Sequence, residues 1–138
     1  MSKKISVGSV MTPNVIVASV DTKFTSIEEF FDNYNIQHLP VAEGDRLIGI
    51  VSINDIMKYI FKKLKSGAAF NQASLLATFD LKEIMTINPV CVHPDDDFSK
   101  VVDILAQGKF QSVPVVRDGL IVGIITNKDV VRVYQQLK

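Results

Sequence analysis

One pattern occurs twice in the chain, as G-I-V-S-I-N-D-I-M-K-Y at residues 49–59 and as G-I-I-T-N-K-D-V-V-R-V at residues 123–133. Each has a glycine, two aliphatic residues, a hydroxyl residue, two spacers and an aspartate. Gly49 and Gly123 lie 74 positions apart, and the same offset holds without a gap from residues 10–60 onto 84–134. It pairs identical residues at, among other places, Met11 with Met85, Pro40 with Pro114 and Asp55 with Asp129. The chain therefore contains a duplicated unit.

Hydrophobic periodicity predicts the same elements in both copies. A β-rich run leads through an Asp/Thr-rich turn into a helix, and two short strands and a second helix follow. The expected ranges are β at 14–19 and 88–93, helix at 24–34 and 98–108, β at 39–42 and 113–116, β at 47–52 and 120–126, and helix at 53–64 and 127–137. Asp118-Gly119 between two apolar runs predicts a hairpin turn. Each unit is β-α-β-β-α.

A unit of about 60 residues buries too little surface to be stable alone. We therefore expect an α/β (α+β) fold in which two β-α-β-β-α repeats pack sheet to sheet around a pseudo-twofold axis. The predicted organisation is a first repeat at 1–64, a linker at 65–75 and a second repeat at 76–138. The stretch 75–85 is expected to form a short helix leading into the second repeat.

Composition narrows the class of protein. The chain of 138 residues is 47% hydrophobic and 22% charged, which is typical of a globular protein. Fifteen basic and fifteen acidic residues give no net charge, which does not favour binding to nucleic acid or to an anionic membrane. The sequence predicts no signal peptide, and it has no apolar run long enough to span a membrane. Together with a single cysteine, Cys91, these features predict a cytoplasmic protein.

The order M-T-x-N, then h-P-V, then G-h-x-[ST]-x-x-D, written twice, resembles a tandem pair of CBS domains (cystathionine β-synthase-type domains). The resemblance covers nearly the whole chain and implies a stand-alone pair without catalytic activity or a catalytic cofactor. It also implies a regulatory module that binds an adenine nucleotide, AMP, ADP or ATP, in the clefts between the repeats. Such pairs commonly form homodimers through their helices and act on a regulated protein, which the sequence does not identify.

The resemblance implies two ligand sites, each built from both repeats. The adenine is expected to lie against the first strand and the pre-proline segment of one repeat, while the other repeat supplies the hydroxyl residue and the aspartate. The first site combines Met11, Ile16, Ile36, Gln37 and Pro40 with Thr126, Lys128 and Asp129. The second combines Met85, Val90, Phe110, Gln111 and Pro114 with Ser52 and Asp55.

The motif has two chemical interpretations. A helix N-terminus with a hydroxyl suits a phosphate, and an aspartate one turn later can accept hydrogen bonds from a ribose diol. The same S/T-x-x-D is also an ordinary capping box, and the two roles are compatible. Gly49 and Gly123 permit close approach of either a ligand or a neighbouring segment.

Charge near the two motifs differs. Lys128 lies inside the second motif, and its counterpart Asn54 is neutral, so the Thr126 site is expected to bind charged phosphates more tightly. His38 and His93 form no metal motif, because ligand spacing is absent. Residues 95–97, all aspartates, are expected to form a turn at a helix start and not a calcium loop.

Two functions compete. The first is a non-enzymatic nucleotide sensor, and the alternative is an interaction or dimerisation module with vestigial clefts. No nucleophile–base pair can be named for an enzyme. The dimer is expected to form through apolar helix residues, with Ile56, Ile60, Val130 and Val133 as candidates.

Overall fold

A computed structural model describes residues 4–67, 71, 73 and 77–137. The chain forms two compact units. Unit 1 comprises Met1–Val15, Asp45–Leu47 and Pro89–Lys138, and unit 2 comprises Ile16–Gly44 and Ile48–Asn88. The fold is mixed α and β with two sheets, which confirms the predicted fold class.

Unit 2 is built on a four-stranded sheet in the order β2-β3-β4-β5. Its elements are β2 (Ala18–Ser19), α2 (Phe24–Tyr34), β3 (His38–Glu43), β4 (Arg46–Ser52), α3 (Ile53–Lys65), α5 (Leu81–Ile84) and β5 (Thr86–Ile87). The core includes Ile27 from α2, Leu39 from β3 and Ile56 from α3. Leu81 and Met85 complete this core, so the segment that opens the second repeat packs into unit 2.

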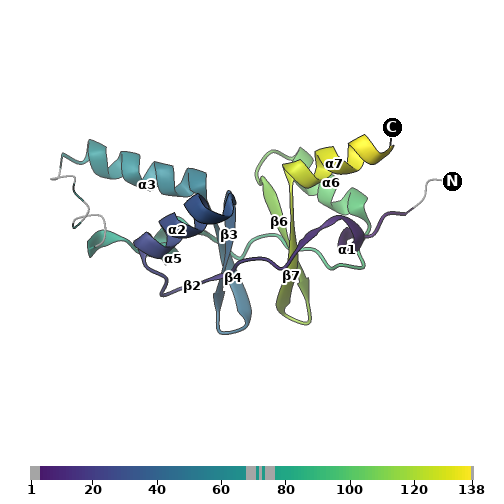
Figure 1. The fold of residues 1–138 in the computed structure, drawn as a ribbon, viewed down its shortest axis with the longest axis horizontal. Helices are drawn as coiled ribbons and strands as arrows, with labels where there is room; N and C mark the ends of the chain where they lie inside the picture. Colours follow the sequence, from purple (N-terminus) through teal and green to yellow (C-terminus); the bar gives the residue numbers. More distant parts are fainter. Residues whose placement is uncertain (1–3, 68–70, 72, 74–76, 138) are drawn as a thin grey trace. The chain divides into compact units, whose positions relative to one another are not determined.

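Unit 1 has a three-stranded sheet in the order β1-β7-β6. Its elements are α1 (Val7–Val10), β1 (Thr12–Pro13), α6 (Phe98–Ala106), β6 (Ser112–Arg117), β7 (Leu120–Thr126) and α7 (Asn127–Leu137). Strands β6 and β7 form the predicted hairpin, and α6 and α7 lie toward the end opposite its turn (Figure 1). Asp118 and Gly119 have φ values of 52° and 81°, which a tight hairpin turn requires.

The two repeats exchange their first segments. Strand β1 of the first repeat pairs antiparallel with β7 of the second, and β5 of the second repeat pairs with β4 of the first. The compact units therefore do not coincide with the sequence repeats at 1–64 and 76–138. Asn14 and Asn88, one repeat apart, lie beside two of the points where the chain changes unit. Both have a left-handed backbone, with φ values of 56° and 50°, which asparagine tolerates better than most residues.

The helices agree with the prediction more closely than the first strands do. All four long helices occur where the periodicity places them, but the runs 14–19 and 88–93 are not continuous strands. Within these two runs, the described structure has only β2 and a single parallel bridge from Val92 to Val115. The left-handed residue at the start of each run explains the interruption. Of the helix expected at 75–85, α5 is present, and residues 74–76 lie outside the described part. The same is true of 68–70 and 72 in the predicted linker.

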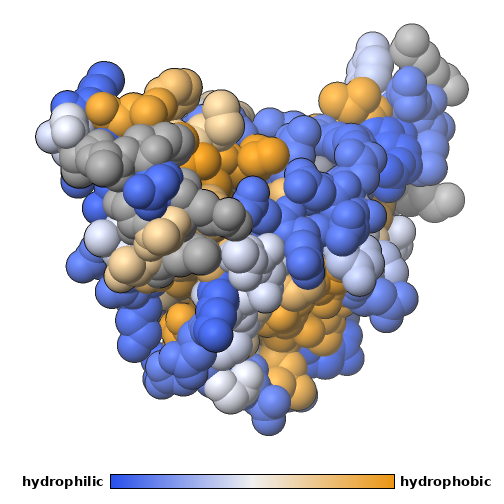
Figure 2. All heavy atoms as spheres, turned by 60° about the vertical axis from the view of Figure 1, so that its left-hand side comes forward, coloured by the Kyte–Doolittle hydropathy of each residue, from blue (hydrophilic) through white to orange (hydrophobic). Residues whose placement is uncertain are grey.

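Two of the four residues predicted for a dimer contact are buried inside the units, so the prediction is wrong for these two; for the other two, which are only partly buried, it stays a prediction. Ile56 and Val133 are buried, and Ile60 and Val130 pack against the two cores. The helical phase instead exposes a different stripe of α3, formed by Ile53, Met57, Phe61 and Leu64. Figure 2 shows hydrophobic side chains reaching the surface among hydrophilic ones.

Candidate ligand-binding site

The hydroxyl–aspartate motif of the first repeat forms a complete capping box at the start of α3. The Asp55 N–H donates to Ser52 Oγ at 3.1 Å, and the Ser52 N–H donates to Asp55 Oδ2 at 2.8 Å. The next helix amide is also used, because the Ile53 N–H donates to the Gln37 carbonyl at 2.9 Å. The capping interpretation is therefore confirmed here. Asp55 still has a second oxygen, Oδ1, that no described residue donates to.

The motif of the second repeat is bonded more extensively. Asp129 Oδ2 accepts from the Thr126 N–H at 2.9 Å and from the Thr126 hydroxyl at 3.4 Å. Its Oδ1 accepts from the Thr12 hydroxyl and from Arg132 Nη1, each at 3.1 Å. Asp129 is only 2% exposed. A charge at this depth is tolerated because it is paired and hydrogen-bonded.

The two motif glycines admit a neighbouring segment and not only a ligand. A Cβ on Gly123 would lie 2.4 Å from Met11 Sδ, and one on Gly49 would lie 2.6 Å from Met85 Sδ. Each methionine belongs to the opposite repeat from its glycine. The glycine of the motif is therefore needed where the exchanged strand crosses it.

His38 lies close enough to Asp55 for the two to interact electrostatically. Burial lowers the pKa of His38, and the negative charge of Asp55 acts in the opposite direction. In the second repeat the equivalent position is Ser112, which is buried and pairs with Thr126 across the hairpin. The two motifs therefore differ in a titratable neighbour as well as in bonding.

The predicted site residues divide between the units. Unit 1 contains Met11, Thr126, Lys128 and Asp129 of the first set and Val90, Phe110, Gln111 and Pro114 of the second. Unit 2 contains Ile16, Ile36, Gln37 and Pro40 of the first set and Ser52, Asp55 and Met85 of the second. In unit 1, Met11 of the first repeat thus lies against β7, which leads into the Thr126–Asp129 motif of the second repeat. In unit 2, Met85 of the second repeat lies against β4, which leads into the Ser52–Asp55 motif of the first.

Two partners of the motif were not among the predicted site residues, namely Thr12 and Arg132. The signals in the sequence were the threonine of M-T and a basic residue three positions after the aspartate. In unit 2, the residues that line a pocket of about 360 Å³ include Asp55 and Lys58, the counterpart of Arg132. Other residues of this pocket include Tyr59, Lys62 and Glu83.

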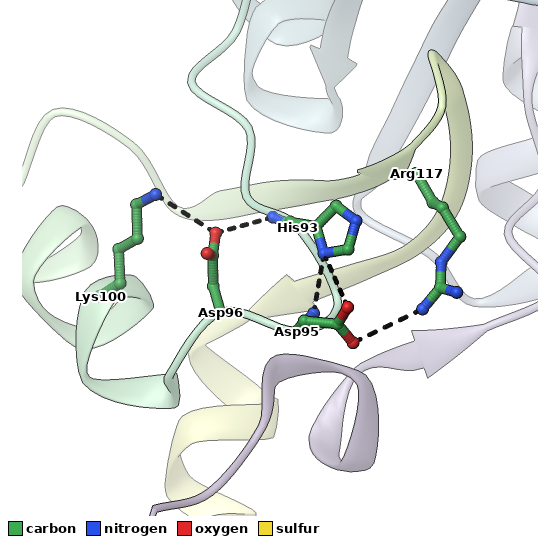
Figure 3. Close-up of polar contacts among 5 residues, drawn as sticks. All are labelled: His93, Asp95, Asp96, Lys100 and Arg117. Carbon is green, nitrogen blue, oxygen red and sulfur yellow. Dashed lines mark hydrogen bonds and ion pairs between the residues drawn. The ribbon is translucent and has the colours of Figure 1, made fainter.

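The three consecutive aspartates form a turn, as predicted. Figure 3 shows two of them, Asp95 and Asp96, with their polar partners. Asp96 accepts from the His93 N–H at 2.8 Å and from Lys100 Nζ at 3.2 Å, and Asp95 lies 3.7 Å from Arg117. Asp97 caps α6 through the Ser99 N–H. The bond from His93, followed by that from Lys100, lowers the pKa of Asp96.

In the described part of the chain, no three His, Cys, Asp or Glu side chains gather as a metal site. No helix among the described residues is long and apolar enough to cross a membrane.

Comparisons with known proteins agree with the duplication. The CBS domain family model matches residues 7–62 and 81–136. An uncharacterized protein, MJ1225, of Methanocaldococcus jannaschii is 28% identical over 130 residues, which is 90% of this chain and 45% of that protein. The inosine-5'-monophosphate dehydrogenase of Korarchaeum cryptofilum is 30% identical over 85% of this chain and 22% of the enzyme. The chain spans less than half the length of both relatives.

Two solved structures are similar over their full length. The structure of CBSX2 in complex with AMP has a TM-score of 0.77 at 28% identity, covering 96% of this chain and 97% of CBSX2. The CBS domain pair of MJ0100, in complex with 5'-methylthioadenosine and S-adenosyl-L-methionine, has a TM-score of 0.79 at 26% identity, covering 99% and 100%. With both copies of its sequence matched and the fold shared, the chain belongs to the CBS domain family.

Proposed function

We propose that the chain is a non-enzymatic regulatory module that binds an adenosine-containing ligand, with AMP, ADP or ATP as the first candidates. The observation that carries this proposal is the duplicated hydroxyl–aspartate motif, in a family whose similar structures hold AMP, 5'-methylthioadenosine and S-adenosyl-L-methionine. In each unit this motif sits at the start of a long helix, where an anionic group is stabilised by the helix dipole. A cytoplasmic location stays a prediction.

The ligand is proposed to contact residues of both repeats. The aspartate of one repeat would hold the ribose, and the pre-proline segment of the other would contact the adenine. Gln37 and Gln111 are exposed, so their side chains are available for this contact. Pro40 and Pro114 are buried, and their contribution is to shape the strand that follows each glutamine.

A thermal-shift series tests ligand binding. The chain is melted with AMP, ADP, ATP, S-adenosylmethionine and 5'-methylthioadenosine, with guanosine monophosphate as the control for adenine recognition. A ligand at one hundred times its Kd stabilises the fold by about 2.7 kcal/mol. With an unfolding entropy of about 2.1 cal/mol/K per residue, this raises Tm by about 9 °C. No shift with any adenosine compound, or an equal shift with the guanosine control, would contradict the proposal.

The alternative, a dimerisation module, is supported by the exposed stripe on α3. Met57 and Phe61 are 47% and 55% exposed and lie one turn apart on one helical face. We propose that this stripe contacts a second copy of the chain in a homodimer. The two proposals are compatible, because Met57, Phe61 and Leu64 of the stripe lie outside the motif. A regulated partner protein is part of the sensor proposal.

A further inference from the structure

The two aspartates of the duplicated motif are not equally available to a ligand. A carboxylate has two oxygens and about four positions at which it accepts hydrogen bonds. At Asp129 all four are used by the protein, through two bonds from Thr126, one from Thr12 and one from Arg132. A ribose diol would have to displace the Thr12 hydroxyl or the guanidinium to reach Oδ1.

Arg132 is well suited to hold this position. Its guanidinium is always charged and forms directional bonds with a carboxylate. The Asp129 side chain is 3% exposed and that of Arg132 is 55% exposed, so the arginine covers the carboxylate from the solvent side. Arg132 thereby donates to Asp129 the hydrogen bond that a ligand would otherwise donate.

The aspartate of the first repeat has no such cover. Asp55 is half-buried, and only its Oδ2 is used, by the Ser52 N–H. Thr86, the counterpart of Thr12, makes no hydrogen bond to Asp55 in the described part of the chain. Lys58, the counterpart of Arg132, lines the same pocket as Asp55 and forms no ion pair with any described residue.

We propose that Arg132 and Thr12 keep the Thr126–Asp129 site closed, so that the chain binds one adenosine-containing ligand, at the Ser52–Asp55 site. This inference rests on the proposed function and reverses the order of affinity that Lys128 suggests from sequence. Lys128 is exposed and belongs to no described ion pair, whereas Arg132 is bonded directly to the aspartate. The direct contact decides access to the carboxylate.

Calorimetric titration with AMP tests the closure. Wild type is expected to bind one AMP per chain. Asp55→Ala should weaken this binding by about tenfold to a hundredfold, the range for losing hydrogen bonds to a charged group. Asp129→Ala should leave AMP binding at the Ser52–Asp55 site unchanged. Arg132→Ala should raise the stoichiometry to two per chain, and Lys58→Ala, at the equivalent position of α3, should not.

Two further variants keep the test decisive. Thr12→Val removes only the hydroxyl and is used if Arg132→Ala does not fold, as judged by circular dichroism; a second bound AMP in this variant supports the closure. Lys58→Arg gives the first repeat the arginine of the second, and it should weaken AMP binding severalfold. Two bound AMP per wild-type chain, or binding lost in Asp129→Ala but kept in Asp55→Ala, would overturn this inference alone. No binding by wild type or any variant would overturn the proposed function as well.

Discussion

Substituting Gly49 by alanine tests the exchange of first segments between the repeats. The added Cβ would lie 2.6 Å from Met85 Sδ and 2.9 Å from the Thr86 carbonyl oxygen. The sulfur belongs to a flexible side chain and can move. The carbonyl belongs to β5, where Thr86 is paired with Ile50, so it cannot withdraw without disturbing the sheet.

The expected cost follows from these contacts. Overpacking a well-packed site costs about 1–3 kcal/mol. Replacing glycine by alanine returns about 0.4–1 kcal/mol by restricting the unfolded chain. We therefore expect Gly49→Ala to lower the free energy of unfolding by about 1–2 kcal/mol. For 138 residues this corresponds to a fall in Tm of about 3–7 °C.

The equivalent glycine provides a matched comparison. At Gly123 the tightest contacts, at 2.4 and 2.8 Å, are both to the Met11 side chain, and the Thr12 carbonyl is further away at 3.1 Å. In a Met11→Ala background, Gly123→Ala should therefore lose most of its cost. In a Met85→Ala background, Gly49→Ala should keep much of its cost, because the Thr86 carbonyl remains.

Urea denaturation of the single and double variants measures both double-mutant cycles. A coupling energy near zero for Gly123 with Met11 would refute the reasoning, since it would mean that the methionine does not pack on the glycine. Unchanged stability in Gly49→Ala would refute it equally, because β5 would then not lie against β4.

The remaining predictions concern pH and assembly. Burial lowers the pKa of His38, so folding favours the neutral form of this side chain. Its contribution to the stability of the fold is complete above the ordinary histidine pKa of about 6.5, and it is lost as the pH falls through the lower pKa of the folded state. Melting curves at pH 7 and 5 should therefore show a larger loss of Tm for wild type than for His38→Gln, and equal losses would count against a buried neutral histidine. Phe61→Asp should convert the proposed dimer into a monomer of 15.3 kDa in light scattering, while Lys62→Ser on the polar face should not; a wild-type monomer at micromolar concentration would contradict the dimer.

The duplication and the main elements could be predicted from the sequence because they depend on local pattern. Helical periodicity located α2, α3, α6 and α7, and the Asp118-Gly119 pair located one hairpin turn. The first strands could not be predicted as well. Apolar residues at 14–19 are compatible with a strand, but the left-handed Asn14 interrupts the extended backbone there.

The repeat pattern alone does not encode the exchange between repeats, and only the family resemblance pointed to it, by combining Met11 with Thr126 and Asp129. Met11 and Met85 occupy equivalent positions in identical motifs, so the pattern is the same whether each packs on its own repeat or on the other. The bond between Thr12 and Asp129 joins residues 117 positions apart, and no local signal encodes it. The capping bonds between Ser52 and Asp55 were thus predictable from the motif, but the bonds of Asp129 to Thr12 and Arg132 were not.

The exchanged segments would give a ligand bound at Asp129 a direct route between the repeats. Thr12 belongs to the first repeat and bonds Asp129 of the second, and the preceding Met11 packs on Gly123 of the same strand pair. A ligand that displaced Thr12 from Asp129 would therefore act on the opening segment of the first repeat without any long chain of contacts. Such a ligand changes the conformation only to the extent that it binds the displaced state more tightly. To open the closed state, a ligand must gain more free energy by this difference in affinity than is lost when the bonds from Arg132 and Thr12 to Asp129 are broken.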